Sequence, residues 1–286
     1  MLSSQPLRSL LFVPADSEPK LAKALGTQAD ALIIDLEDAV APVNKSRARE
    51  IAAAFLNRGR GGYKGAVLVR FHECASPEFE RDCRLLREAV PDGIVMAKCS
   101  SADDVGRLAD ALQHYPCGVV PMIESAFALL QAASIATASP RVAALGFGAE
   151  DFSSDVGITR SDGEPELLYA RSAVVTAARA AGIRAVDTPW LAYRDEAGLE
   201  AAAQRARNLG FSGKLAIHPA QLATLNRVFF PTREEIARAE EIIRWADLHG
   251  TGATGRDGQM IDEAVVRKAR IILGAASGQG SSGAAQ

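Results

Sequence analysis

The sequence predicts a (β/α)₈ barrel with a C-terminal helical extension. Eight short apolar runs recur along the chain, segments with helical spacing lie between them, and polar residues follow nearly every run. Buried parallel strands are typically continuous apolar runs, and eight such units in about 220 residues fit a closed barrel. An open doubly wound sheet is the main alternative. The first strand is not followed by a G-x-G-x-x-G turn, and the polar residues gather at the carboxyl end of the strands, so the barrel is favoured.

The elements are predicted in a regular alternation. The expected strands cover 10–13, 31–36, 66–69, 93–97, 118–123, 142–147, 183–186 and 214–217. The expected helices cover 18–29, 45–56, 77–89, 102–114, 125–138, 166–181 and 196–209. Several of these helices begin after a capping residue, such as Ser76, Ser101 or Asp195.

The chain continues beyond the eighth expected strand by more residues than a (β/α)₈ barrel needs. We therefore divide it into a catalytic barrel over 1–228, a helical arm over 229–274 and a disordered tail over 275–286. Thr232 and Glu235 form a capping-box pattern that begins one helix of the arm, and a second amphipathic segment begins near Ile261. We expect this arm to pack on a neighbouring subunit.

Composition limits the classes of partner. The chain has 32 Lys and Arg against 35 Asp and Glu, so it has no basic excess for nucleic acid. No apolar run approaches the roughly 20 residues of a membrane helix, and the N-terminus lacks the pattern of a signal peptide. We expect a cytosolic protein that does not bind membranes, and whose four cysteines are reduced and mostly buried.

The residues that follow the expected strands are rich in carboxylates. Because a barrel's active site lies at the carboxyl ends of its strands, these acids would converge on one mouth. They would repel one another unless a cation lay among them. Carboxylates without a cysteine or histidine cluster point to Mg²⁺, with Mn²⁺ as the alternative.

Glu124 and Asp151 are the candidate metal ligands. Glu124 follows an apolar run, and Asp151 ends the turn that follows the next one. Neighbouring strands lie about 4.8 Å apart, so both carboxylates can reach one ion. The alternative for each is that it caps the following helix.

Arg70 and the acids of the segment DLEDAV are the next candidates. Arg70 ends a strand and is suited to bidentate binding of a carboxylate or an enolate oxygen, although a salt bridge to a nearby acid is the alternative. Asp35, Glu37 and Asp38 are interpreted as a second layer that holds metal-bound water, with loop capping as the alternative.

Two further side chains at strand ends have open interpretations. Lys98 is a candidate for binding an anionic substrate, and a structural pairing with the carboxylates is equally compatible with its position. His218 is interpreted as a hydrogen-bonded packing histidine in preference to a catalytic acid or base.

Seven motifs together resemble the citrate lyase beta-subunit-like family of the HpcH/HpaI aldolase superfamily. They occur in order between about Arg8 and Leu273. The motifs are RSLLFVPAD, DLEDAV, VLVRF, PMIES, GFGAEDF, KLAIHPAQ and GQMID.

This resemblance implies a trimeric barrel enzyme, or a dimer of trimers, that uses Mg²⁺. Such enzymes cleave or form a carbon–carbon bond in a 3-hydroxy-acyl-CoA of the malyl, citramalyl or citryl type, giving a short acyl-CoA and a keto acid. It implies that Glu124 and Asp151 bind the metal and that Arg70 holds the substrate and stabilises its enolate. It also implies that Asp262, which from the residues alone reads as a helix residue, acts from the arm of the adjacent subunit.

The sequence departs from the family at two places. The first loop reads PADSEP where the family often has glycine and arginine, and His72 stands where relatives commonly have asparagine. Two other activities remain open. One is a thioesterase that releases free hydroxy acid, and the other is a citryl lyase subunit that needs a carrier protein.

Overall fold

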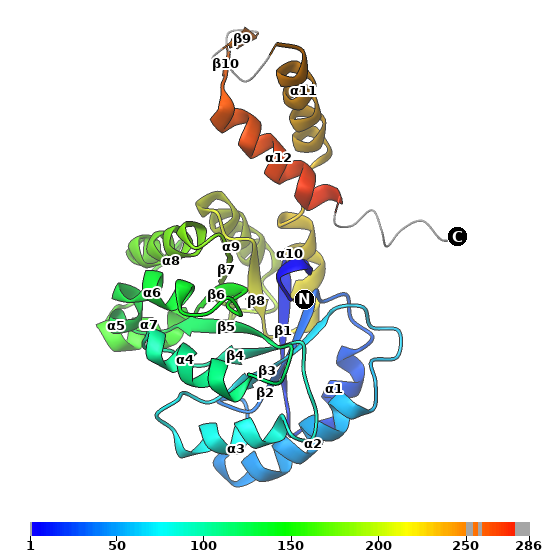
Figure 1. Cartoon of the computed structure of the whole chain (residues 1–286), viewed down its shortest axis with the longest axis vertical. Coiled ribbons are helices and arrows are strands. Elements are labelled where there is room, and N and C mark those ends of the chain that lie inside the picture. The colour runs from blue at the N-terminus through cyan, green and yellow to red at the C-terminus, as the bar shows by residue number, and fades with distance from the viewer. Residues whose placement is uncertain (1, 250–253, 257–258, 278–286) are drawn as a thin grey trace. The chain divides into compact units, whose positions relative to one another are not determined.

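The computed structural model describes residues 2–249, 254–256 and 259–277 and contains a closed parallel barrel (Figure 1). Its strands follow one another in chain order around the barrel. They are β1 Ser9–Pro14, β2 Ala31–Asp35, β3 Ala66–Phe71, β4 Gly93–Met96, β5 Gly118–Ile123, β6 Ala144–Phe147, β7 Arg184–Asp187 and β8 Gly213–Ala216. The barrel closes where Leu10 of β1 pairs with Leu215 of β8 on one side and with Ala31 of β2 on the other. The predicted fold class is confirmed.

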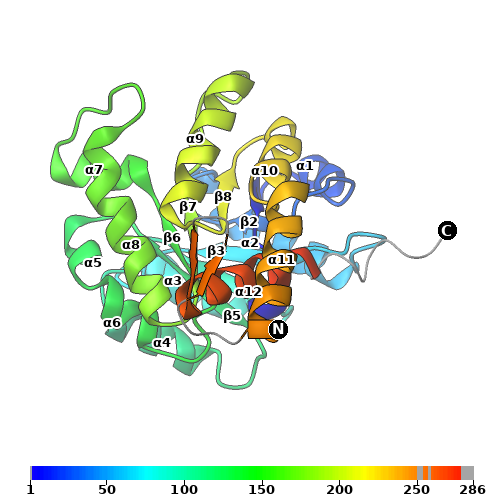
Figure 2. The same cartoon turned by 90° about the horizontal axis from the view of Figure 1, so that it is seen from above.

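Helices surround the strands, as Figure 2 shows from above. They are α1 Glu18–Ala24, α2 Lys45–Asn57, α3 Pro77–Leu85, α4 Ala102–Ala111, α5 Ala126–Leu130, α6 Ala132–Thr137, α7 Ala149–Val156, α8 Leu168–Ala180, α9 Glu196–Leu209 and α10 Leu222–Val228. Short 3₁₀ turns cover Leu2–Ser4, Pro42–Asn44, Pro165–Leu167 and Pro219–Gln221.

The helices differ from the prediction at three places. The single helix expected over 125–138 is two helices, because Gln131 leaves helical geometry between α5 and α6. The turn expected to end at Asp151 is the first turn of α7, which is too short to show a clear helical period in the sequence. Helix α10 was not predicted either.

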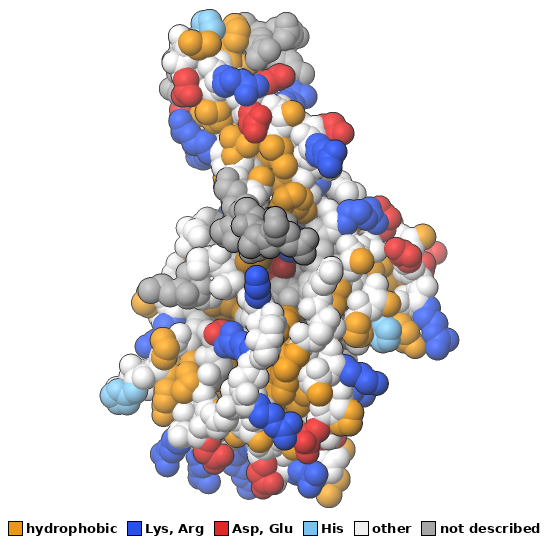
Figure 3. Space-filling view, turned by 90° about the vertical axis from the view of Figure 1, so that its right-hand side faces the viewer, with side chains coloured by type: hydrophobic (Ala, Val, Ile, Leu, Met, Phe, Trp, Pro, Cys, Tyr) orange, Lys and Arg blue, Asp and Glu red, His pale blue; other side chains and the backbone are white. Residues whose placement is uncertain are grey.

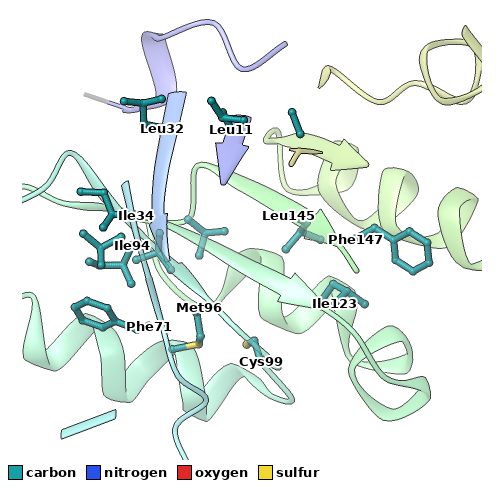
Figure 4. Close-up of a cluster of buried hydrophobic side chains, with 14 of the residues drawn as sticks. Leu11, Leu32, Ile34, Phe71, Ile94, Met96, Cys99, Ile123, Leu145 and Phe147 are labelled. Atoms are coloured by element: carbon teal, nitrogen blue, oxygen red, sulfur yellow. The ribbon is translucent and has the colours of Figure 1, made fainter. Parts of the chain in front are cut away.

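Successive side chains along each strand point alternately into two apolar layers. Leu11, Leu32 and Ile34 belong to the large layer between strands and helices, whereas Leu10 and Ile33 belong to the smaller cluster of the barrel interior. Figure 4 shows side chains of the outer layer, among them Phe71, Met96 and Phe147. Because side chains alternate along a strand, this pattern fixes which residues at each strand end face the barrel interior.

Residues Phe230–Gln286 form a second compact unit. It contains α11 Arg233–His249, the short strands β9 Thr254–Arg256 and β10 Gln259–Ile261, and α12 Glu263–Ser277. The backbone N–H of Thr232 donates to Glu235 Oε2 over 2.8 Å, and the N–H of Glu235 donates to the Thr232 hydroxyl over 3.2 Å, so the expected capping box is present.

The small core of this unit contains Ala246, Ile261 and Val266. Helix α12 continues past residue 274 into the segment expected to be a tail. Residues 278–286 lie outside the described residues, and the packing of the arm on a neighbouring subunit stays a prediction.

The other expectations about the chain concern its surface and thiols. No helix of the described ranges is long and apolar enough to cross a bilayer. On the face drawn in Figure 3, basic and acidic side chains are intermixed. The four cysteines are free thiols, and Cys83 alone among them is half-buried while the others are buried.

Candidate active site

The alternation of side chains carries three charged residues into the mouth of the barrel. On β2, Ala31 and Ile33 face the interior, and Asp35 is the next residue in that series. By the same period, Arg70 follows Leu68 on β3, and Glu124 follows Met122 of β5. Asp35 and Glu124 are buried, and the Arg70 side chain is 11% exposed.

Arg70 is held by two carboxylates and a ring. Its Nε donates to Asp35 Oδ1 over 2.8 Å, and its Nη2 donates to Asp35 Oδ2 over 2.6 Å. Its Nη1 lies 3.0 Å from Glu37 Oε2, and the guanidinium lies 4.7 Å from the centre of the Phe12 ring. Burial opposes the charge of Arg70, but the bonds and charge of Asp35 outweigh it and raise the pKa above its ordinary range.

Asp35 also fixes the loop that follows its own strand. Its two oxygens accept hydrogen bonds from the backbone N–H groups of Glu37, over 2.9 Å, and Ala39, over 3.2 Å. Lys45 Nζ holds the same loop, donating to the carbonyls of Leu36 and Glu37 over 2.9 and 2.6 Å. Asp35 thus acts on the site through Arg70 and through this loop.

Glu37 connects Arg70 to Lys98. Lys98 Nζ lies 2.5 Å from Glu37 Oε1 and 3.5 Å from Oδ2 of Asp38, which is largely exposed. Burial lowers the pKa of Lys98, but its bond to Glu37 and the charge of Glu37 outweigh that effect and raise the pKa. Lys98 is a charged ammonium at the mouth that is paired with Glu37 and Asp38. This is the structural pairing with carboxylates that was the alternative to substrate binding.

Glu124 is a further buried carboxylate of the mouth. Its Oε2 accepts the backbone N–H of Lys98 over 2.7 Å, and Lys98 adopts a positive φ of 46° there. Burial raises the pKa of Glu124 to about 7, although the Lys98 N–H and the charge of Arg70 oppose the shift. The nearby charge of Asp151 adds to the rise.

Gly146 in β6 and Gly148 directly after that strand make room for Met122 of β5 and for Glu124, which follows β5. A Cβ added to Gly146 would lie 2.3 Å from the sulfur of Met122, and one added to Gly148 would lie 2.4 Å from Oε1 of Glu124. Gly148 is the N-cap residue of α7, so the Glu124 carboxylate occupies the space that a capping side chain would need.

Asp151 lies in the first turn of α7, the helix whose N-cap residue Gly148 adjoins the Glu124 carboxylate. It is half-buried, and no other described residue forms a hydrogen bond or ion pair with its carboxylate. The preceding Glu150 pairs with Arg160, which also pairs with Glu164. A carboxylate left without a protein partner beside a buried second carboxylate is suited to a cation.

The pair Glu124 and Asp151 fits a magnesium ion. No group of three or more His, Cys, Asp or Glu side chains capable of binding a metal occurs in the described part of the chain. Mg²⁺ is commonly bound through one or two carboxylates, with substrate and water as its other ligands. A cation there would also stabilise the charged form of Glu124, whose burial otherwise favours the protonated form.

Direct comparison with known proteins decides which family the chain belongs to. Residues 8–219 match the model of the protein family described as HpcH/HpaI aldolase/citrate lyase. The chain belongs to this family. The expectation from the seven motifs is therefore confirmed, and the chain is a member of a family of carbon–carbon lyases.

Relatives within the HpcH/HpaI family cover nearly the whole chain. A citrate lyase subunit beta-like protein of Deinococcus radiodurans is 37% identical over 93% of this chain and 96% of its own length. A (3S)-malyl-CoA thioesterase of Cereibacter sphaeroides is 36% identical over 94% of each chain. The crystal structure of CitE from Mycobacterium tuberculosis, in complex with magnesium, acetoacetate and coenzyme A, is 29% identical with a TM-score of 0.81, over 97% of this chain and all of that one.

The structure also places the remaining candidates of this HpcH/HpaI member. Asp262 lies in the second unit, where its Oδ1 accepts the N–H of Val265 over 3.0 Å and caps α12. His218 is exposed, its Nδ1 accepts the N–H of Ala220, and its ring stacks on Tyr193 at 4.6 Å between centres.

A neighbouring hollow of about 310 Å³ includes Glu37, Lys98 and His72 in its lining. Asp82, fully buried, fixes His72 through the ring Nδ1 at 2.7 Å and the backbone N–H at 2.9 Å. The residue that departs from the family pattern is therefore immobilised beside the site.

Sequence reasoning missed three residues that shape the site. Phe12 lies against Arg70, Gly148 makes room for Glu124, and Thr188 bonds to the start of α7. The inward period of β1, which runs through Leu10 to Phe12, could have revealed the first. The glycines that flank Phe147 were available as a signal of close packing.

Proposed function

We propose that this chain is a Mg²⁺-dependent lyase that cleaves, or in reverse forms, the carbon–carbon bond of a 3-hydroxy-acyl-CoA. The substrates we propose are malyl-, citramalyl- or citryl-CoA, and the products a short acyl-CoA and a keto acid. The observation that carries the proposal is the half-buried Arg70, fixed by Asp35 and Glu37, in the same mouth as Glu124. Asp151, whose carboxylate has no partner among the described residues, adds to it.

The metal would be held by Glu124 and Asp151. Mg²⁺ bound there supplies Lewis-acid polarisation of the substrate's hydroxyl or keto oxygen and orients its carboxylate. Gly148 keeps the space beside Glu124 free of a side chain, and the N–H of Lys98 directs the carboxylate. Mn²⁺ is the proposed alternative, because the same oxygen ligands suit both ions.

Arg70 would stabilise the enolate of the thioester. Breaking the bond next to the hydroxyl-bearing carbon leaves negative charge on the thioester fragment, and a fixed guanidinium stabilises that charge without reorganising. Asp35, Glu37 and Phe12 fix the guanidinium, so its orientation is set before the substrate binds. Lys98 adds positive charge at the edge of the mouth and would attract the anionic substrate.

Asp262 would exchange a proton with the thioester carbon from the arm of a neighbouring subunit. A carboxylate is a suitable general base or acid for this step if it lies within hydrogen-bond reach of that carbon. The proposal therefore includes a homotrimer or a dimer of trimers, in which each site needs a second chain.

A thioesterase is the second candidate, because a relative of 36% identity is a (3S)-malyl-CoA thioesterase. The same substrate would then yield free CoA and a hydroxy acid. A third form of the proposal is a citryl lyase subunit that needs a carrier protein, and the relative named citrate lyase subunit beta-like protein is what suggests a subunit.

A product assay separates these activities. Purified protein is incubated with malyl-, citramalyl- and citryl-CoA, with Mg²⁺ or with EDTA, and the products are identified by mass spectrometry. Metal-dependent release of a short acyl-CoA and a keto acid supports the lyase, whereas free CoA supports the thioesterase. Metal binding without turnover points to a carrier protein. A Glu124→Ala variant with full activity would contradict the proposed site.

A further inference from the structure

The first turn of α7 lacks a capping side chain of its own. Its N-cap residue is Gly148, and no side chain of that residue can satisfy the free N–H groups at the start of the helix. A Ser, Thr, Asp or Asn at this position would place its Cβ 2.4 Å from Oε1 of Glu124. The presence of Glu124 in the mouth therefore excludes the ordinary way of capping this helix.

Thr188 supplies the missing acceptor from the neighbouring strand. The N–H of Ala149, the first residue of α7, donates to Thr188 Oγ1 over 3.1 Å, and the bond is buried. Thr188 follows β7 directly and is 2% exposed. Val186 faces the barrel interior, so the period of the strand places Thr188 on the same side.

Asp187, the residue before Thr188, holds the end of β7 in place through two ion pairs. Asp187 Oδ2 lies 2.5 Å from Lys214 Nζ on β8, and Asp187 Oδ1 lies 3.0 Å from Nε of Arg171 on α8. All three side chains are buried. The backbone on which Thr188 stands is thus fixed to two neighbouring elements.

We infer that Thr188 is a positioning residue that holds the first turn of α7 so that Asp151 lies beside Glu124. Ala149 is two residues before Asp151 in the same helical turn, so a shift at Ala149 moves the Asp151 carboxylate. The inference rests on the proposed function of Glu124 and Asp151 as metal ligands. It adds a residue that directly follows β7 and acts through α7 without touching metal or substrate.

The test uses two substitutions at Thr188. Thr188→Val keeps the shape of the side chain and removes the oxygen, whereas Thr188→Ser keeps an oxygen. Binding of Mn²⁺ to the metal-free full-length protein is measured by isothermal titration calorimetry, and unfolding is followed in EDTA. We expect Thr188→Val to weaken Mn²⁺ binding about fivefold, as for the loss of one buried hydrogen bond, and Thr188→Ser to stay within about twofold of wild type.

Thr224→Val is the matched control. Thr224 is also 2% exposed, and its hydroxyl bonds to Glu196 over 3.1 Å, between α10 and α9. This control should lose stability and keep Mn²⁺ affinity. If Thr188→Val binds Mn²⁺ as wild type does, the positioning role is wrong and the metal site stands. If wild type and Glu124→Gln bind Mn²⁺ equally, the metal site is wrong and the positioning role falls with it.

Discussion

Asp35 and Arg70 are register partners on β2 and β3, and two hydrogen bonds of 2.8 and 2.6 Å join their side chains. Because Asp35 is the last residue of β2 and Arg70 the last but one of β3, the pair lies where the barrel opens. A carboxylate that accepts both arms of one guanidinium fixes its plane as well as its position. The enolate-stabilising role proposed for Arg70 depends on this fixed plane.

Replacing Arg70 by lysine should therefore remove most activity. A single ammonium cannot bond to both oxygens of Asp35 and also reach Glu37. We expect Arg70→Lys to lower kcat about 100-fold, the effect typical of losing one preorganised donor to a developing oxyanion, while Mn²⁺ binding persists. Arg141→Lys is the control, because Arg141 is also half-buried and its guanidinium donates to the carbonyls of Tyr115 and Cys117, before β5. Near-normal kcat in Arg70→Lys would refute the role.

In the metal-free protein, ionisation of the buried Glu124 carboxyl group should lower the free energy of unfolding. Burial raises its pKa from 4.5 to about 7, so between these values the folded protein binds a proton that the unfolded chain releases. The stability that the folded protein gains from protonated Glu124 is fully present below pH 4.5 and is lost as the pH rises through 7. In EDTA at pH 8, Glu124→Gln should be more stable than wild type by about 3 kcal/mol in urea unfolding, the value of a pKa rise from 4.5 to about 7.

This difference should shrink towards pH 5, where wild-type Glu124 is protonated as well. Mg²⁺ should stabilise wild type and leave Glu124→Gln unchanged. Glu80→Gln, at an exposed glutamate of α3, should show neither effect. An unchanged difference between pH 5 and pH 8 would mean that Glu124 is not the group that titrates.

The sequence predicted the barrel and its charged mouth because both follow from simple periods. Apolar runs mark the strands, and the residue type at each strand end is visible directly. A salt bridge from Arg70 to a nearby acid was expected as an alternative, but its pairing with Asp35 in particular depends on the register of two strands, which the sequence does not show. Thr188 was missed because its contact with Ala149 spans 39 residues of chain and leaves no local pattern.

The stability of the barrel should depend strongly on the buried ion pair between Asp187 and Lys214. Burial raises the pKa of Asp187, but the charges of Lys214 and Arg171 outweigh it and lower the pKa below its ordinary value. Asp187→Leu leaves Lys214 buried without its counter-charge, so we expect a loss of about 3–5 kcal/mol in urea unfolding. The double variant Asp187→Leu/Lys214→Met should recover part of that loss, since it removes both charges. A double variant less stable than the single one would show that the pair is not the cause.

Asp262 should act on the barrel of another subunit. Asp262→Asn keeps an oxygen that can accept the Val265 N–H and cap α12, but it removes the base, so the unfolding temperature should hold while turnover fails. Glu124→Gln should be inactive for a different reason. If each site joins the barrel of one chain to the arm of the next, equal mixing of the two inactive variants gives about a quarter of the sites a full set of residues. Activity near that fraction is expected once the oligomers have been dissociated and reassembled, with each variant treated alone as the control. Mixed oligomers verified by mass spectrometry that stay inactive would place Asp262 in the site of its own chain or outside it.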